Sequence, residues 1–440
     1  MYQAGFCELD ITPPIGTIIP GYFHARYSQG VLDPLYARAC VIRQGDGYAA
    51  FVTADCCGLY RCVTDEVRRR VAEQTPIPPE RVMVMATHTH SGGPTLNWGE
   101  EVRIDPVYLE SFVKKLADAL IVAWQRMADS QLAFGEEQLQ GVSFIRVYRM
   151  KDGSLKTNPG CGNPEAAAPV GQVDPAVSVL SVRQNGRPVG AVVNFACHPA
   201  VVGGLLTSAD YIGVLSQQMK ERFGPGFVTV FINGACGNIN HFDLSDPSTF
   251  LPERYLQMGR ELAAKAAAAV ESPLQLLAEG PVTVWESVLS AGLRKPTREM
   301  VNWAWEHIHS LGGEYAARTP DTPEYFETFF AIQTFTLMLD KRQEAEIYLQ
   351  LLRIGDLEVF GTPCQLFVEF GRAMKEGSAA PFSMVSAFAN DYLGYVPTPE
   401  CMTEGVYEAR LAPTSCLASD TGGRIVEAML EMSRQLGEKL

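Results

Sequence analysis

The sequence carries little charge for its length. Of its 440 residues, 20% are Asp, Glu, Lys or Arg and 47% are hydrophobic. That balance excludes a disordered chain or a coiled coil. The 36 Lys and Arg against 50 Asp and Glu give a net charge of −14. The protein therefore lacks the basic surface that binds a phosphate backbone, and no nucleic-acid partner is expected.

Membrane and export signals are also missing. The N-terminus has no basic stretch followed by an apolar one, because Asp10 and the Pro13-Pro14 pair interrupt it early. No apolar run reaches the roughly 20 residues that cross a bilayer, so no membrane anchor is expected. The eleven cysteines include no CxxC pair and, apart from Cys56-Cys57, are scattered singly. Reduced thiols and a cytoplasmic location fit this pattern best.

Internal repeats, low-complexity tracts and Gly/Ser linkers are absent, which predicts one interlocked domain over residues 1–440. Strand and helix patterns alternate, and Asn185-Gly186 between two strand patterns predicts a hairpin. The expected fold class is α/β, with mixed, partly antiparallel β-sheets flanked by α-helices. Strands are predicted at 38–44, 48–54, 82–87, two in 131–150, two in 176–196, 227–233, 281–290, 347–353, 357–361 and 383–388, and helices at 62–74, 108–127, after Tyr211, 253–271, 298–309, 323–340, 366–376 and 423–437.

Two of the seven histidines, His88 and His90, directly follow the apolar strand pattern 82–87. Ligands usually lie at the carboxyl ends of strands in an open α/β sheet. In an extended backbone the two rings point to opposite sides, so they share one ion only if the chain bends, which the Gly92-Gly93 pair permits. One metal ligand and one polarising residue is the simpler division; a pair of structural histidines is the alternative.

His198 closes a second apolar strand, which Pro199 ends. Two histidine segments at strand ends are compatible with one shared metal site, and imidazole nitrogen suits zinc. The loop 234–240 follows a third buried strand and is either a site where backbone N–H groups approach a substrate oxygen or a plain tight turn.

Weaker candidates surround these segments. Asp55 follows the strand 48–54 and is either a carboxylate that holds a metal-bound imidazole or a helix-capping residue. His24 and His241 lie in loops that could line a pocket. His307 and His309 are two apart in a predicted helix and are expected to be surface or packing residues.

Taken in order, several segments resemble the catalytic domain of the neutral/alkaline non-lysosomal ceramidase family, a group of zinc-dependent amide hydrolases. The resemblance runs nearly from end to end of the chain. It is carried by residues 10–14 (DITPP) with Gly16 and Gly21-Tyr22, 33–38 (DPLYAR), 86–92 (ATHTHSG), Asp174-Pro175, 195–199 (FACHP), 208–210 (SAD) and 390–396 (NDYLGYV).

The resemblance implies roles for individual residues. His88 and His198 match zinc ligands, and Tyr395 matches a metal-coordinating Tyr. His90 matches the residue that assists at the substrate carbonyl, while Arg146 and Tyr407 match a pocket Arg and an active-site Tyr. A zinc ion held in this way acidifies a bound water and polarises the carbonyl.

This sequence departs from the family at two positions. Gln365 stands where the family has a Glu zinc ligand, and a neutral carboxamide is the weaker ligand, so zinc affinity should fall or the coordination should change. Glu369 could replace it if residue 365 opens a helix, because the two would share a face. Asn240 stands where the family's ceramidases carry a Ser, so ceramide itself is not the expected substrate.

The family's C-terminal β-sandwich has no counterpart before the last residue. We therefore expect a zinc-dependent hydrolase of a C–N amide bond, or of an ester, in a small substrate, acting by metal-activated water. A homo-oligomer is compatible with the sequence. Two other hypotheses stay open: a non-catalytic, ceramidase-like protein that binds a small carbonyl compound, and a TIM-barrel amidohydrolase with an HxH metal motif, which requires further His and Asp ligands at later strand ends.

Overall fold

The computed structural model describes residues 1–99, 101–272, 275–312, 319–320 and 322–438. Its largest sheet has the strand order β16-β14-β13-β8-β1-β5-β6-β7, with β18 paired to β8. Most neighbours are antiparallel, but β6 runs parallel to β7 and β14 runs parallel to β16. The strands are β1 (Tyr2–Asp10), β5 (Tyr36–Gln44), β6 (Gly47–Ala54), β7 (Val82–Ala86), β8 (Ala128–Gln138), β13 (Ala176–Gln184), β14 (Arg187–Phe195), β16 (Val228–Asn233) and β18 (Gln275–Leu276).

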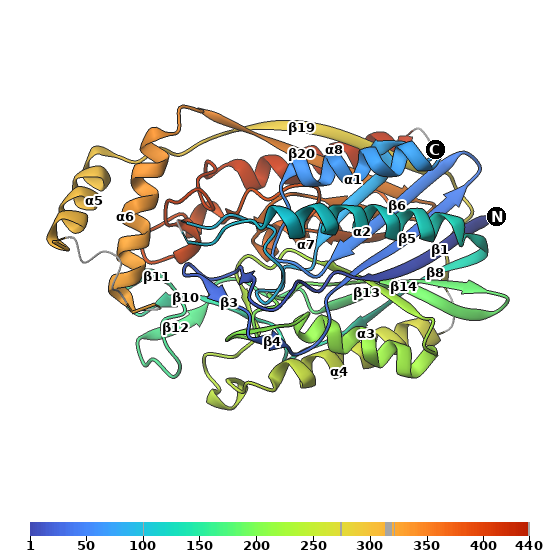
Figure 1. Ribbon diagram of the computed structural model, residues 1–440, viewed down its shortest axis with the longest axis horizontal. Helices are drawn as coiled ribbons and strands as arrows, with labels where there is room; N and C mark the ends of the chain where they lie inside the picture. Colours follow the sequence, from blue (N-terminus) through green and yellow to red (C-terminus); the bar gives the residue numbers. More distant parts are fainter. Residues whose placement is uncertain (100, 273–274, 313–318, 321, 439–440) are drawn as a thin grey trace.

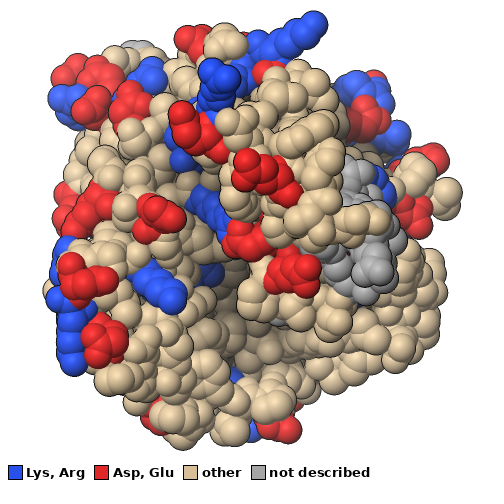
Figure 2. Space-filling view, turned by 90° about the vertical axis from the view of Figure 1, so that its left-hand side faces the viewer, with Lys and Arg blue, Asp and Glu red and all other residues tan. Residues whose placement is uncertain are grey.

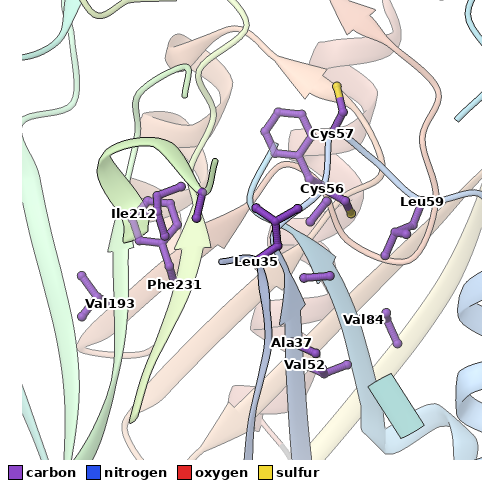
Figure 3. Packing of buried hydrophobic residues seen from close by; sticks show 14 of the residues in the cluster. Leu35, Ala37, Val52, Cys56, Cys57, Leu59, Val84, Val193, Ile212 and Phe231 are labelled. Atoms are coloured by element: carbon purple, nitrogen blue, oxygen red, sulfur yellow. The ribbon is translucent and has the colours of Figure 1, made fainter. Parts of the chain in front are cut away.

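The two halves of this sheet are joined by a short pairing of Tyr2–Ala4 with Ala128–Ser130. The sheet is curled, since the edge strand β16 of one half contacts β5 and β6 of the other half. Helices α1 (Arg61–Gln74) and α2 (Pro106–Gln125) pack on one half, and α3 (Asp210–Phe223) and α4 (Arg254–Glu271) on the other. The apolar side chains between helices and strands form one large core, part of which Figure 3 shows with Ala37, Val52, Val84, Val193 and Phe231 labelled.

A second, four-stranded sheet packs on the opposite face of the first. Its order is β19-β20-β21-β23, and its strands are β19 (Val282–Gly292), β20 (Glu344–Ile354), β21 (Leu357–Gly361) and β23 (Phe382–Ser386). A second core cluster fills the space between the two sheets. Helices α7 (Val368–Gly377) and α8 (Thr421–Glu438) cover the outer face of this sheet, which gives four layers in the order helix, sheet, sheet, helix.

A pair of helices, α5 (Arg298–Ser310) and α6 (Pro323–Leu339), is inserted between β19 and β20. The pair lies at one end of the molecule, and both chain termini lie at the other (Figure 1). Helix α6 contacts the N-terminal segment through aromatic rings, since Phe329 stacks on Phe23 at 3.9 Å between centroids.

The predicted mixed α/β class is confirmed, and the hypothesis of a TIM barrel is wrong, because the strands form mixed sheets rather than eight parallel ones. The first strand, β1, was missed. Gly5 interrupts its apolar pattern, and a side chain there would meet the Ala123 carbonyl of α2 at 2.1 Å, so close helix packing rather than strand propensity explains the glycine. Within the described residues, no helix has both the length and the apolarity to span a membrane.

Eleven short strands form small pairings around the sheets; β9 and β10 lie in the range 131–150, where a second strand was predicted, and the other nine were missed. They are β2 (Ile18–Ile19), β3 (Arg26–Tyr27), β4 (Gly30–Val31), β9 (Phe144–Ile145), β10 (Val147–Met150), β11 (Leu155–Thr157), β12 (Ala166–Pro169), β15 (Leu206–Thr207), β17 (Ile239–Asn240), β22 (Gln365–Leu366) and β24 (Tyr395–Val396).

Candidate active site

The chain turns sharply directly after β7, at His88. His88 has φ of +70°, in the left-handed region that non-glycine residues rarely occupy. This turn brings His88 Nε2 to 3.4 Å from His90 Nε2, so the two rings converge although they are two residues apart. The bend was expected at the following glycines, which is wrong. Gly92 serves a close approach instead, since a side chain there would meet the Cα atom of Cys56 at 2.8 Å.

His198 reaches the same point from the end of β14. Its Nε2 lies 3.2 Å from His88 Nε2, and its ring centroid lies 5.1 Å from that of His90. The two segments are also tied through the backbone, because the N–H of His90 donates to the carbonyl of Pro199 at 3.1 Å. The predicted convergence of the two strand-end histidine segments is therefore present.

Both proposed ligand rings face a backbone carbonyl with their other nitrogen. His88 Nδ1 lies 2.5 Å from the carbonyl oxygen of Cys57, and His198 Nδ1 lies 3.2 Å from that of Cys236. An Nδ1–H that donates to a carbonyl leaves the lone pair of Nε2 free to bind a metal. Asp55 was expected in this role or as a helix cap, and both expectations are wrong. Its carboxylate accepts hydrogen bonds from Arg38 and from the N–H of Tyr36.

Burial keeps the three rings neutral. It lowers the pKa of His88 to about 4 and places the pKa values of His90 and His198 well below their usual range, and the positive charge of Arg146 adds to the effect for all three. Neutral imidazole is the form that binds a metal.

Cys57 adds a sulfur that sequence reasoning had not singled out as a ligand. Ligand atoms of Cys57, His88 and His90 all lie within 4.8 Å of one another, which makes this group a candidate metal site. The sulfur faces Nδ1 of His88 at 3.8 Å, on the opposite side of the ring from Nε2. Burial raises the pKa of Cys57 to about 12, so the sulfur stays a thiol near neutral pH.

Gln365 and Tyr395 are direct neighbours in the short parallel pairing of β22 with β24. Both side chains are buried. The Nε2 atom of Gln365 donates to the Tyr392 hydroxyl at 2.5 Å, while its buried Oε1 atom has no hydrogen-bond partner among the described residues. The Gln365 side chain also interacts with His88 and raises its pKa, which partly offsets the lowering of that pKa by burial. An unpartnered, buried oxygen beside this imidazole fits an oxygen ligand to a cation.

Arg146 binds Tyr395 and two other groups of the protein. Its guanidinium donates to the carboxylate of Glu408 at 2.5 Å, to the Gly237 carbonyl at 2.6 Å and to the Tyr395 hydroxyl at 3.2 Å. The ring of Tyr407 lies 5.8 Å from that of Tyr395. Burial raises the pKa of Tyr395 to about 12 although Arg146 lowers it, so the phenol is protonated near neutral pH.

Two other candidates from the sequence, Asn240 and Glu369, form side-chain hydrogen bonds with asparagines. The Asn240 amide donates to Asn158 Oδ1 at 2.7 Å. Glu369 accepts a hydrogen bond from Asn238 Nδ2 at 3.0 Å, and burial raises the pKa of its carboxyl. The condition for Glu369 to replace a ligand at 365 is not met, because residue 365 lies in a strand and the helix begins at Val368.

The remaining candidates are the loop 234–240 and the histidines outside the cluster. In the loop 234–240, the N–H groups of Gly234 and Gly237 donate to backbone carbonyls, and the carbonyls of Cys236 and Gly237 accept from His198 and Arg146. The histidines outside the cluster divide as follows: His241 is partly buried with its pKa lowered to about 3, His24 packs against Tyr22, His307 contacts Thr328, and His309 is exposed.

Comparisons with known proteins identify a family and a similar fold. The sequence profile of the family described as "Neutral/alkaline non-lysosomal ceramidase, N-terminal" matches residues 2–241. The fold is similar to the crystal structure of neutral ceramidase from Pseudomonas aeruginosa, with a TM-score of 0.73 and 22% identity over 100% of this chain and 75% of that one. A solved structure described as "Ceramidase complexed with C2" gives a TM-score of 0.72 and 19% identity over 100% of this chain and 76% of that one. No curated protein matches.

Proposed function

The chain belongs to the neutral/alkaline non-lysosomal ceramidase family, whose characterised members are hydrolases, and we propose that it is a zinc-dependent hydrolase of a C–N amide bond, or of an ester, in a small substrate. His88, His198 and Tyr395 would hold the ion, with Gln365 Oε1 as a fourth, weaker ligand. We propose that ceramide itself is not the substrate, because Asn240 stands where the family's ceramidases carry a Ser.

The spacing of the imidazole nitrogens carries this proposal. Two nitrogen ligands at about 2.05 Å from a tetrahedral zinc stand roughly 3.3 Å apart. The Nε2 atoms of His88 and His198, the two proposed imidazole ligands, are 3.2 Å apart. We favour this set over one that includes Cys57, because the Cys57 sulfur faces Nδ1 of His88, on the opposite side of the ring from the Nε2 atom that would bind the ion.

The other roles in the proposed reaction belong to side chains near the ligands. A bound zinc ion would acidify a water molecule and polarise the substrate carbonyl. His90, whose Nε2 atom lies 3.4 Å from that of His88, would interact with the substrate carbonyl. The Tyr407 hydroxyl would donate to the oxygen that gains negative charge. Arg146 holds Tyr395 through a direct hydrogen bond, which fixes the phenol.

Metal analysis of protein purified without chelator tests the proposal. We expect about one zinc per chain in the wild type and a loss of zinc in His88→Ala and His198→Ala. His309→Ala is the matched control, because His309 is exposed on α5. Hydrolysis of a small amide should depend on added zinc and follow the same pattern. A wild type that neither binds zinc stoichiometrically nor cleaves amides or esters would refute it.

A second candidate is a non-catalytic protein that binds a small carbonyl compound. The observation that favours it is the neutral side chain at Gln365 in place of a carboxylate. The two differ in a thermal-shift experiment. Stabilisation by Zn²⁺ that disappears in the two histidine variants supports the hydrolase, whereas stabilisation by small amides without turnover in any divalent metal supports the binding protein.

A further inference from the structure

A cavity of about 560 Å³ opens beside the candidate site. It touches the proposed machinery at Arg146 and Tyr407, and a side chain at Gly21, which also lines it, would meet the ring of His90 at 2.8 Å. Figure 2 looks onto the end of the molecule formed by α5 and α6 and shows it hollowed, with Lys or Arg atoms at the hollow and Asp or Glu atoms beside them. The described residues that line the cavity are Gly21, Tyr22, Phe23, Arg146, Thr157, Asn158, Phe326, Phe330, Tyr407 and Arg410.

Aromatic rings make up half of this lining and connect in series to the candidate site. The ring of Tyr407 lies 6.4 Å from that of Phe330 and 6.2 Å from that of Phe23. Phe23 in turn lies 5.6 Å from Phe326 in an edge-to-face arrangement. Edge-to-face and offset geometries are the ones that aromatic rings prefer, so another ring can join this series with favourable contacts.

The charges of the lining are already compensated. Arg146 pairs with the fully buried Glu408. Arg410 forms a two-point ion pair with Glu327 of α6, at 2.6 and 2.9 Å, and its guanidinium lies 3.9 Å from the ring centroid of Phe330. A substrate carboxylate would have to compete with these two Glu residues for either guanidinium, which reduces the gain that an unpaired Arg would offer.

Two polar groups of the lining bond to protein. Thr157 Oγ1 donates to Glu408 at 2.6 Å, and Asn158 Oδ1 accepts from Asn240 at 2.7 Å. Besides the hydroxyls of Tyr22 and Tyr407, what the cavity offers to a ligand is mainly ring surface. Its volume lies within the range of sites that hold one drug-sized molecule, of about 300–1,000 Å³, rather than two extended hydrocarbon chains.

We propose that this cavity binds the acyl group of the substrate and selects an uncharged aromatic acyl group of about phenylacetyl size. The inference rests on the proposed function, because it assigns a substrate class to the same site. Helix α6 acts as a specificity element: Phe330 supplies ring contact, and Glu327 prevents Arg410 from attracting anionic acyl groups.

A panel of amides that share one amine tests this selectivity. The wild type with zinc would be assayed on N-phenylacetyl, N-hexanoyl, N-dodecanoyl and N-succinyl derivatives. We expect kcat/KM to be highest for the phenylacetyl compound and lowest for the succinyl compound, with a difference of about tenfold or more. A preference for the dodecanoyl or the succinyl compound would overturn the proposal.

Two variants connect the preference to named residues. Phe330→Ala should lower kcat/KM for the phenylacetyl compound about fivefold or more, relative to the hexanoyl compound. Phe250→Ala, at an exposed ring outside the cavity, is the matched control and should change nothing. Glu327→Gln keeps the shape but frees the charge of Arg410, so it should improve the succinyl compound relative to the phenylacetyl compound by about tenfold. An unchanged preference in both lining variants would overturn the assignment to this cavity.

Binding to an inactive variant separates this inference from the proposed function. Phenylacetamide, hexanamide and succinamate would be titrated into His198→Ala by calorimetry, where no hydrolysis is expected. Tightest binding of phenylacetamide, weakened by Phe330→Ala, supports the cavity assignment even if the wild type cleaves nothing. Zinc-dependent hydrolysis with no such binding order would leave the proposed function intact and refute the aromatic acyl site.

Discussion

Replacing Gln365 with Glu restores a carboxylate at a buried position, and the result depends on whether a cation binds there. Gln365 is fully buried, and its Oε1 atom has no partner among the described residues. Without metal, the new carboxyl must either lose its solvation as an anion or take up a proton. Protonating a Glu of pKa about 4.3 at pH 7 costs roughly 2.7 × 1.36, or about 4 kcal/mol, which is the upper limit of the destabilisation.

With zinc, the same carboxylate gains a cation as its partner. We expect Gln365→Glu to bind zinc at least about tenfold more tightly than the wild type, which corresponds to about 1.4 kcal/mol. The variant should therefore be less stable than the wild type in EDTA and should recover most of the difference in zinc. Urea unfolding in both conditions measures the free energy of unfolding, and competition with a coloured chelator measures the zinc affinity.

Gln350→Glu is the matched control. Gln350, in β20, is equally buried, but both atoms of its amide have protein partners, since Nε2 donates to the carbonyl of Glu80 and Oε1 accepts from Asn390. It should be destabilised in EDTA without recovery in zinc. Equal zinc affinity of Gln365→Glu and the wild type, or equal recovery in the Gln350→Glu control, would refute the placement of residue 365 at a metal.

Three further predictions address the surroundings of the site. Arg146→Met leaves the carboxylate of Glu408 buried without its cation and should lower the free energy of unfolding by about 3–5 kcal/mol, with partial recovery on adding Glu408→Gln; unchanged urea unfolding would contradict this. Burial raises the pKa of Asp210 from 3.8 to about 6. The free energy of unfolding should therefore be highest below about pH 4 and should fall as the pH rises to about 6, where the buried carboxyl ionises. Asp210→Asn cannot ionise and should gain about 3 kcal/mol on the wild type between about pH 4 and pH 7; parallel pH curves would contradict it. Gly21→Ala places a methyl group 2.8 Å from the ring of His90, at a φ of +110°, and should reduce kcat with zinc content unchanged; loss of zinc as well would show that His90 is itself a ligand.

Most of the fold could be read from local patterns, because long strands and amphipathic helices repeat every two or about 3.6 residues. The strand-end positions of His88, His90 and His198 were readable for the same reason. The short strands β22 and β24 were not, since two-residue pairings have no periodicity. Their pairing nevertheless decides that Gln365 and Tyr395 are neighbours.

Several expectations remain predictions. They include the single domain over residues 1–440, the cytoplasmic location, the small-molecule partner and the compatibility with a homo-oligomer. The roles of His90, Arg146, Tyr407 and Asn240 are likewise predictions.

By itself, the sequence determined the fold class and which residue types follow the buried strands, since both depend on neighbours along the chain. Tertiary structure decided everything that depends on distance between segments. The left-handed turn at His88, the carbonyl of Cys57 instead of Asp55 behind its ring, and the Glu327 partner of Arg410 come from residues far apart in the chain. The packing of strands and helices decides which side chains meet at a site, and local sequence composition does not predict that packing.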